Sequence, residues 1–151
     1  MAEFTYNPVQ EVAPNSPVIL NTAIGCNKGY VLHRNESGIV TLRGIVNNPR
    51  SCFARYNVEF NANIAVPEGE TVGPIAVAIA IDGEPLPISR AIVTPAAVDN
   101  YFNVCCLATI DVVRGCCNSI AVENVSASNE PGTIQIPINV QNATLRVTRT
   151  A

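Results

Sequence analysis

Charged residues are scarce in this sequence, and several residue types on which catalysis depends are nearly missing. Only 14% of the 151 residues are charged, tryptophan is absent, and Lys28 and His33 are the single lysine and the single histidine. An average soluble domain has about 25% charged residues. We therefore expect another chain to cover part of the surface. A monomer with a neutral surface rich in asparagine and threonine is the alternative.

These absences exclude several classes of function. The net charge is -3 and no cluster of basic residues is present, which argues against binding to nucleic acid or to an acidic membrane. A Ser–His or Cys–His nucleophile needs a histidine base, and a cupin metal site needs several histidines. His33 follows an apolar run beside a turn, where a surface or capping histidine is the commoner case. We expect no catalytic residue, no metal site and no cofactor, so the protein is not predicted to be an enzyme.

Long apolar segments are missing too. The longest unbroken apolar run, Ile75 to Ile81, is far too short to cross a bilayer. The first ten residues show neither the basic nor the apolar region of a secretory signal. We expect synthesis in the cytoplasm and, if the protein leaves the cell, release by another route, such as particle assembly followed by lysis.

Six cysteines are present, and four of them form two adjacent pairs. Neighbours on a strand point to opposite faces, so neither pair is well placed to bond within itself or to hold one zinc ion. Three states remain open, namely buried free thiols, disulfides formed after release, and a zinc site. The candidate thiol or disulfide residues are Cys26, Cys52, Cys105, Cys106, Cys116 and Cys117.

The strongest positive signal is alternation of apolar and polar residues with a period of two. From Cys52 to Ile64 the even positions are apolar, and the odd positions after Phe53 are polar. The same pattern recurs over 40–46, 102–111, 120–123, 134–141 and 144–148. It predicts half-buried β-strands, and turn residues separate the segments. The sequence therefore predicts an all-β fold, a jelly-roll β-sandwich of about 8–10 antiparallel strands.

One predicted strand, Ile75 to Ile81, is apolar on both faces, because Ala76, Ala78 and Ala80 lie between the isoleucines and valine. A strand of this kind is usually buried on both faces. The alanine face indicates close approach by another layer or subunit. An alanine patch left in solvent is the alternative.

Prolines Pro8, Pro14 and Pro17 make the first segment an edge strand or an extended arm. We divide the chain into an extended N-terminal arm, residues 1–16, and a jelly-roll domain, residues 17–151.

Several stretches resemble the second half of the tumour-necrosis-factor/C1q-like jelly roll. They are GPIAVAIAIDGEPLP, YFNVCCLATIDV, the turn VRG with CCNSIAVENVS, and the ending NATLRVTR. The bacterial and phage versions are most similar, namely heads of spore-surface collagen-like proteins and small structural proteins of phages. The resemblance covers residues 17 to 151 and implies a homotrimer whose inner-sheet faces meet around a threefold axis. The collagen-like stalk of the spore-surface and C1q proteins is absent.

The resemblance leads to our functional expectation, a structural protein of a virion or virus-like particle. The first reading is a homotrimeric capsid decoration (cementing) protein that binds the major capsid protein of a bacteriophage assembled in the host cytoplasm. The alternative is a non-catalytic trimeric binding head, a fibre tip or spore-surface protein that recognises glycan or protein. Expected subunit-interface residues are Ala76, Ala78, Ala80, Phe53 and Tyr101, and expected partner-anchoring residues of the arm are Phe4, Tyr6, Pro8 and Val9.

Overall fold

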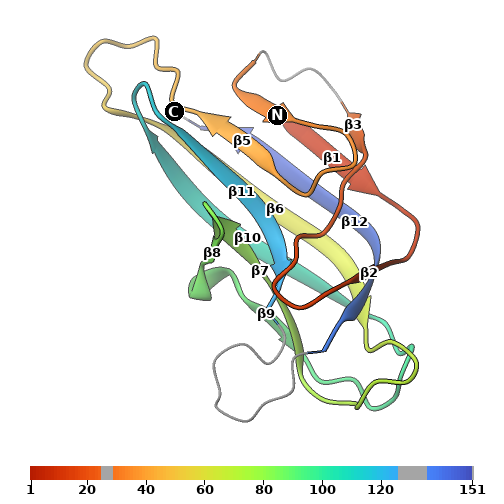
Figure 1. Cartoon of the computed structure of the whole chain (residues 1–151). Coiled ribbons are helices and arrows are strands. Elements are labelled where there is room, and N and C mark those ends of the chain that lie inside the picture. Colours follow the sequence, from red (N-terminus) through yellow and green to blue (C-terminus); the bar gives the residue numbers. More distant parts are fainter. Residues whose placement is uncertain (25–28, 126–135, 151) are drawn as a thin grey trace.

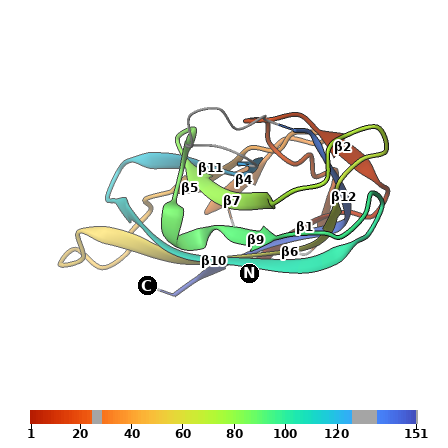
Figure 2. The same ribbon diagram turned by 90° about the horizontal axis from the view of Figure 1, so that it is seen from below.

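The computed structural model describes residues 1–24, 29–125 and 136–150. Within these residues the regular structure is β-strand, apart from one 3-10 turn, η1 (Pro87–Ser89). The strands form two antiparallel sheets that pack face to face (Figures 1 and 2). The predicted all-β jelly-roll sandwich is confirmed. The described residues contain strands β1 to β12, against the 8–10 expected, because several strands have only two or three residues.

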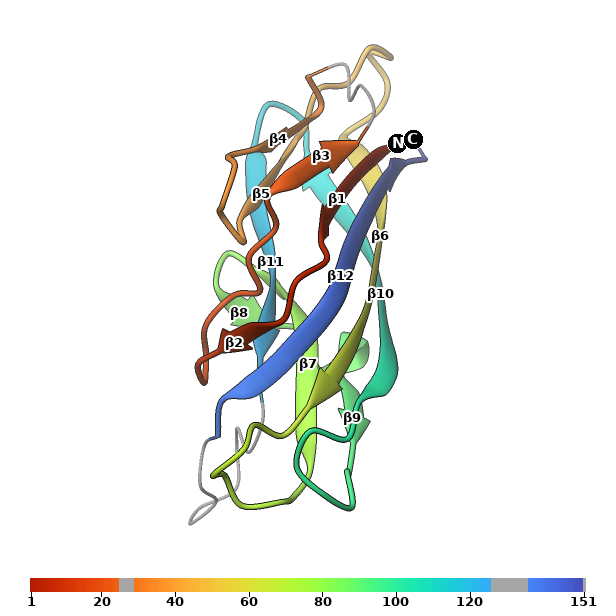
Figure 3. The ribbon, with the colours of Figure 1, turned by 90° about the vertical axis from the view of Figure 1, so that its right-hand side faces the viewer.

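Sheet A has the strand order β10-β6-β12-β1-β3, and β2 pairs with the start of β12. The first and last strands of the chain therefore lie side by side near its centre (Figure 3). The strands of sheet A are β1 (Ala2–Tyr6), β2 (Gln10–Val12), β3 (Thr22–Ile24), β6 (Phe53–Ala65), β10 (Phe102–Val113) and β12 (Ile138–Arg149).

Sheet B has the order β4-β5-β11-β7-β8, and β9 pairs with β7 beside β8. Between β8 and β9, the buried hydroxyl of Ser89 accepts a hydrogen bond from the Ile79 amide at 2.9 Å. The strands of sheet B are β4 (Val31–His33), β5 (Val40–Arg43), β7 (Ile75–Ile81), β8 (Glu84–Pro85), β9 (Ala91–Val93) and β11 (Cys117–Asn124).

Strand β6 shows how the sequence specifies the sandwich. Its even positions from Ala54 to Ile64 are buried in the core, while its odd positions from Arg55 to Asn61 are exposed. This confirms the predicted alternation along β6. Cys52 departs from the pattern, because it precedes the strand and its side chain is exposed.

The core lies between the sheets and is almost entirely apolar. Tyr56 is its largest fully buried side chain, and its hydroxyl donates a hydrogen bond to the Arg43 carbonyl oxygen of sheet B at 2.6 Å. Burial raises the pKa of the Tyr56 phenol, chiefly by desolvation. Tyr56 therefore links the two sheets with an apolar ring and a satisfied polar group.

The sequence predicted that residues 1–16 extend from the domain as an arm. In the structure β1, within this segment, pairs with strands of sheet A instead. Strand β1 pairs with β12 over Ala2 to Tyr6 and with β3 on its other side. Phe4 is only 1% exposed, so it packs in the core and is not available to anchor a partner. Tyr6 is half-buried, whereas Pro8 and Val9 are exposed between β1 and β2. The backbone hydrogen bonds of sheet A and the burial of Phe4 hold this segment on its own chain.

The loops gather at two opposite ends of the sandwich (Figure 1). At the end where β6 starts and β10 and β12 finish, loop 44–52 lies against turn 114–116. A Cβ atom at Gly44 would meet the Val113 carbonyl oxygen at 2.1 Å, so only glycine fits this contact. We call this the terminus-bearing end, because both chain termini lie there.

The distal end carries loops 66–74 and 94–101, which are joined by a hydrogen bond from the Asp99 amide to the Val66 carbonyl oxygen at 2.9 Å. Among the described residues no helix is long and apolar enough to span a membrane.

Candidate functional site

The outward face of sheet A is the most distinctive surface of the molecule. Because side chains alternate along a strand, the core-facing residues of β6, β10 and β12 leave a second set directed away from the core. We call this set the sheet A face. Its members include Arg55, Asn57, Glu59, Asn61, Asn63, Asn103, Cys105, Leu107, Thr109, Asp111, Thr144 and Arg146.

Amide side chains form a hydrogen-bonded group across β6 and β10. Asn61 donates to the Asn103 side-chain oxygen at 3.1 Å, and Asn103 donates in return to Asn61 and to Asn63, both at 3.1 Å. Asn61 also lies 3.0 Å from the Cys105 sulfur. Further along the same pair of strands, Thr109 donates to Asn57 at 3.1 Å. Much of the polarity of this face is therefore satisfied within the chain.

The charges of the sheet A face are paired in the same way. Arg55 contacts Asp111 through two hydrogen bonds, from Nε at 2.7 Å and from Nη2 at 2.8 Å. The hydrogen bond from Arg55 holds the pKa of the Asp111 carboxyl below its usual value. Arg146 lies 3.6 Å from Glu3 and 3.9 Å from Glu59. The face is thus close to neutral.

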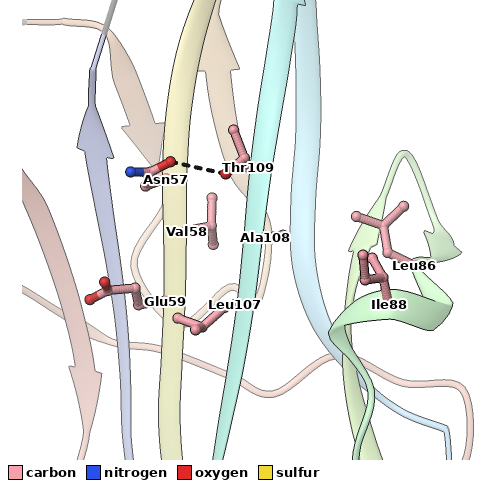
Figure 4. Close-up of a pocket in the computed structure, with 8 residues that line it drawn as sticks. All are labelled: Asn57, Val58, Glu59, Leu86, Ile88, Leu107, Ala108 and Thr109. Atoms are coloured by element: carbon pink, nitrogen blue, oxygen red, sulfur yellow. Dashed lines mark hydrogen bonds between the residues drawn. The ribbon is translucent and has the colours of Figure 1, made fainter.

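Leu107 stands between two hollows in this face and is 64% exposed. The larger hollow, of about 490 Å³, lies between β6, β10 and the segment of η1, and Leu86 and Ile88 form its apolar wall (Figure 4). The smaller one, of about 220 Å³, extends from Leu107 past Cys105 to Thr144 and Arg146. An exposed leucine beside hollows on a neutral face is suited to contact with another protein.

The alanines of β7 occupy the outward side of sheet B, as the alternation predicted, but they are already buried in the single chain. Ala76 is 5% exposed, and Ala78 and Ala80 are 0% exposed. They offer almost no free surface to a second subunit. Phe53 and Tyr101 are half-buried, and the Arg55 guanidinium lies 5.0 Å from the centre of the Phe53 ring. A role of these five residues in a subunit interface stays a prediction.

The cysteines occupy different environments. Cys52, Cys105, Cys116 and Cys117 are exposed free thiols, whereas Cys106 is buried and burial raises its pKa to about 12. Cys26 lies outside the described residues. The adjacent residues Cys105 and Cys106 point to opposite faces of β10, as the alternation requires.

The contacts of His33 are those of a residue that supports the fold. Its Nε2 lies 2.9 Å from the Ser37 carbonyl oxygen, and its ring lies 4.6 Å from the Phe4 ring. Neither contact provides the cysteine or carboxylate partner that a catalytic base needs. Across the described ranges, no three side chains of His, Cys, Asp or Glu come together in a way that could hold a metal ion.

Sequence reasoning passed over the central residues of the sheet A face. The alternation assigned its polar positions to solvent and gave no reason to single out Asn61, Asn103 or Leu107. One signal was present, because Cys105 and Leu107 are apolar residues at positions where their neighbours in the pattern, Asn103 and Thr109, are polar.

Comparison with known proteins identifies the fold. No family model matches the sequence, and none of the curated proteins matches it either. Among solved structures, the globular domain of zebrafish complement 1qA protein aligns over 99% of this chain and 97% of that one, with 12% identity and a TM-score of 0.59. Eiger TNF from S. frugiperda aligns over 100% and 92%, with 10% identity and a TM-score of 0.62.

These two likenesses show that the chain has a tumour-necrosis-factor/C1q-like jelly-roll fold. At 10–12% identity they show the fold alone. They indicate no enzyme family.

Proposed function

Because the chain has the jelly-roll fold of tumour-necrosis-factor and C1q domains, we propose that it is a non-catalytic structural protein that assembles through the sheet A face. We propose a homotrimer that decorates and stabilises the capsid of a virion or virus-like particle. The particle role follows the resemblance of the sequence to small phage and spore-surface proteins. The single observation that carries the assembly is the sheet A face itself, which is neutral, internally hydrogen-bonded and centred on exposed Leu107.

A second subunit that covers this face removes its polar groups from water. A buried polar group that loses water without gaining a partner destabilises a complex. Asn61 and Asn103 already bond to each other, and Arg55 bonds to Asp111. A second subunit can therefore cover these groups and gain from burying Leu107 without leaving them unsatisfied. This also accounts for a surface with so few charges.

The assembly is tested by sedimentation of the full chain at micromolar concentration. We expect a stable oligomer, and a homotrimer in particular. The substitution Leu107→Asp should lower the mass while leaving the circular dichroism spectrum unchanged, because Leu107 contributes little to the core. A matched control is Leu32→Asp, since Leu32 is also an exposed leucine on a strand but belongs to sheet B. A monomeric wild-type protein, or equal effects of the two variants, would contradict the proposal.

The particle role needs its own measurement. Electron microscopy of the native assembly should show the protein on the outside of a regular shell, and purified oligomer should bind shells that lack it. Oligomers that never associate with a shell would rule out decoration while leaving the assembly intact.

The second candidate is a trimeric binding head, and the hollow beside η1 favours it. Its volume of about 490 Å³ is within the range of small-molecule sites. Its lining residues include leucine, isoleucine, asparagine and glutamate but no aromatic ring on which a sugar could stack. A protein ligand therefore fits this surface better than a glycan. A glycan array with strong hits would favour the head over the capsid protein.

A further inference from the structure

The two ends of the sandwich carry opposite charge. Loop 44–52 and turn 114–116 of the terminus-bearing end contain one arginine each and no carboxylate side chain. Arg50 and Arg114 are both exposed, and Arg114 donates to the Pro49 carbonyl oxygen at 3.1 Å, which holds the turn against the loop. Arg43 and Arg149 end β5 and β12 at the same end.

Two of these arginines contact uncharged groups of the same chain. Arg43 donates to the Gly29 carbonyl oxygen at 3.1 Å, and the Arg149 guanidinium lies 4.2 Å from the centre of the Tyr30 ring. Near this end, Asp111 forms an ion pair with Arg55. Loop 44–52 and turn 114–116 of the terminus-bearing end therefore carry net positive charge on a protein whose total charge is negative.

The distal end has the reverse composition. Loops 66–74 and 94–101 contain Glu68, Glu70 and Asp99 and no lysine or arginine. Glu68 and Asp99 are exposed, and Glu70 is half-buried. Glu11 of β2 is exposed near the same end, because β2 pairs with the first residues of β12.

We propose that the terminus-bearing end is a docking surface for the distal end of a second copy, so that copies associate head to tail. The two surfaces lie at opposite ends of one sandwich and have complementary charge. Such a contact is heterologous, since each copy uses a different surface on either side, and it can continue from copy to copy. It does not use the sheet A face, so it is independent of the assembly proposed above.

The proposed contact is electrostatic and exposed to solvent, so its strength depends on the salt concentration. Exposed ion pairs contribute little individually and are screened by salt. Two ends made of loops form a small interface of the transient class. Association is therefore weak in free solution and becomes significant where copies are crowded, as on the surface of a particle.

Light scattering of the full chain tests the proposal. As salt rises from about 20 mM to about 500 mM the Debye length falls from about 20 Å to about 4 Å. The basic unit is the monomer or the oligomer that forms through the sheet A face. At low salt we expect a mass above that of the basic unit. At high salt we expect the mass to return to that of the basic unit. Arg50→Glu should lower the association constant about fivefold or more, as should Glu68→Lys, because attraction becomes repulsion. Both side chains are exposed, so both variants should fold normally.

Matched controls separate a local contact from net charge. Arg34→Glu changes the charge as Arg50→Glu does, but Arg34 is exposed in the loop between β4 and β5. Glu84→Lys is the control for Glu68→Lys, since Glu84 lies in β8. We expect both controls to associate like the wild type.

A mixture gives the sharpest test. The Arg50→Glu variant keeps its acidic end, and the Glu68→Lys variant keeps its basic end. Each alone should remain a single unit, and the two together should regain association, because their intact ends attract each other and the two reversed charges also have opposite sign. Salt-independent mass, equal effects of the controls, or failure of the mixture to pair would overturn the proposal. Binding of single-stranded DNA to the terminus-bearing end in place of self-association would also overturn it.

Discussion

On the sheet A face, side chains such as Asn61 and Leu107 stand in solvent, whereas on the outward side of β7 the alanines are completely enclosed. Both surfaces point away from the main core, and both belong to long, regular strands. The difference lies in whether the outward-facing side chains of each strand are buried or exposed. Strand β7 is buried on both sides, while β6 and β10 leave a neutral surface that only another molecule could cover. A substitution should therefore change the free energy of unfolding much more at β7 than on the sheet A face.

The largest difference is expected for an introduced carboxylate. Ala78→Asp places a charge at a position with 0% exposure and should lower the free energy of unfolding by about 3–4 kcal/mol. Asn57→Asp on the sheet A face keeps the acceptor for Thr109 and should change it by less than about 0.5 kcal/mol. Urea titration of both variants measures this. Similar urea midpoints for the two variants would contradict the difference in burial between the two surfaces.

The two sides of β10 should differ in thiol reactivity. Cys105 is exposed on the sheet A face, whereas Cys106 is buried with its pKa raised to about 12. Since the thiolate is the nucleophile, we expect iodoacetamide at pH 8 to modify Cys105 at least about 100-fold faster. Mass spectrometry of the Leu107→Asp variant measures both rates on an uncovered face. Slower modification of Cys105 in the wild type would place that residue inside the assembly, and equal rates at the two cysteines would contradict the structure.

A buried and an exposed asparagine give a third contrast. Asn124 is 1% exposed, and its side chain donates to the carbonyl oxygens of Val12 and Ile136, both at 3.0 Å. Asn124→Ala leaves these acceptors without their donor and should cost about 2 kcal/mol. Asn61→Ala, on the exposed face, should cost less than about 0.5 kcal/mol. Thermal unfolding of both variants at high salt is the measurement, and a larger loss for Asn61 would be inconsistent with the burial of the two side chains.

The smallest effect is expected at the ion pair of the sheet A face. The hydrogen bond from Arg55 lowers the folded-state pKa of Asp111, so the pair stabilises the fold above the unfolded pKa of about 3.9. That contribution is lost as the pH falls through the lower folded-state pKa. Asp111→Asn should therefore slightly reduce stability at pH 7 and make no difference well below pH 3, with a smaller effect in high salt. A stability difference that persists in strong acid would show that another interaction is responsible.

The sequence was sufficient for the sandwich and for most of its inward-facing residues, because alternation with a period of two reports directly which side of a strand is buried. It failed for the first strand. Prolines at positions 8, 14 and 17 indicated an arm, but the pairing partner of Ala2 and Phe4 is β12, more than a hundred residues later. No local pattern encodes a partner at that separation.

The sheet A face was predictable only in part. Alternation placed Asn57 and Asn61 on an outward surface, but their partners Thr109 and Asn103 follow from the register of β6 against β10. Register depends on how two distant segments align, and period-two patterns allow several alignments. The same limit applies to the opposite charge of the two ends, which becomes visible only when loops from different parts of the chain are brought together.

The position of β12 has a consequence for how the protein is made. β12 lies between β6 and β1, so sheet A stays open at its centre until β12 has left the ribosome. Until then β6 and β1 each expose an unpaired edge, which is the usual template for pairing with a neighbouring nascent chain. Pairings between distant segments also form slowly. The twelve residues of β12, from Ile138 to Arg149, thus complete sheet A, and translation speed over this segment should influence how much of the product folds correctly.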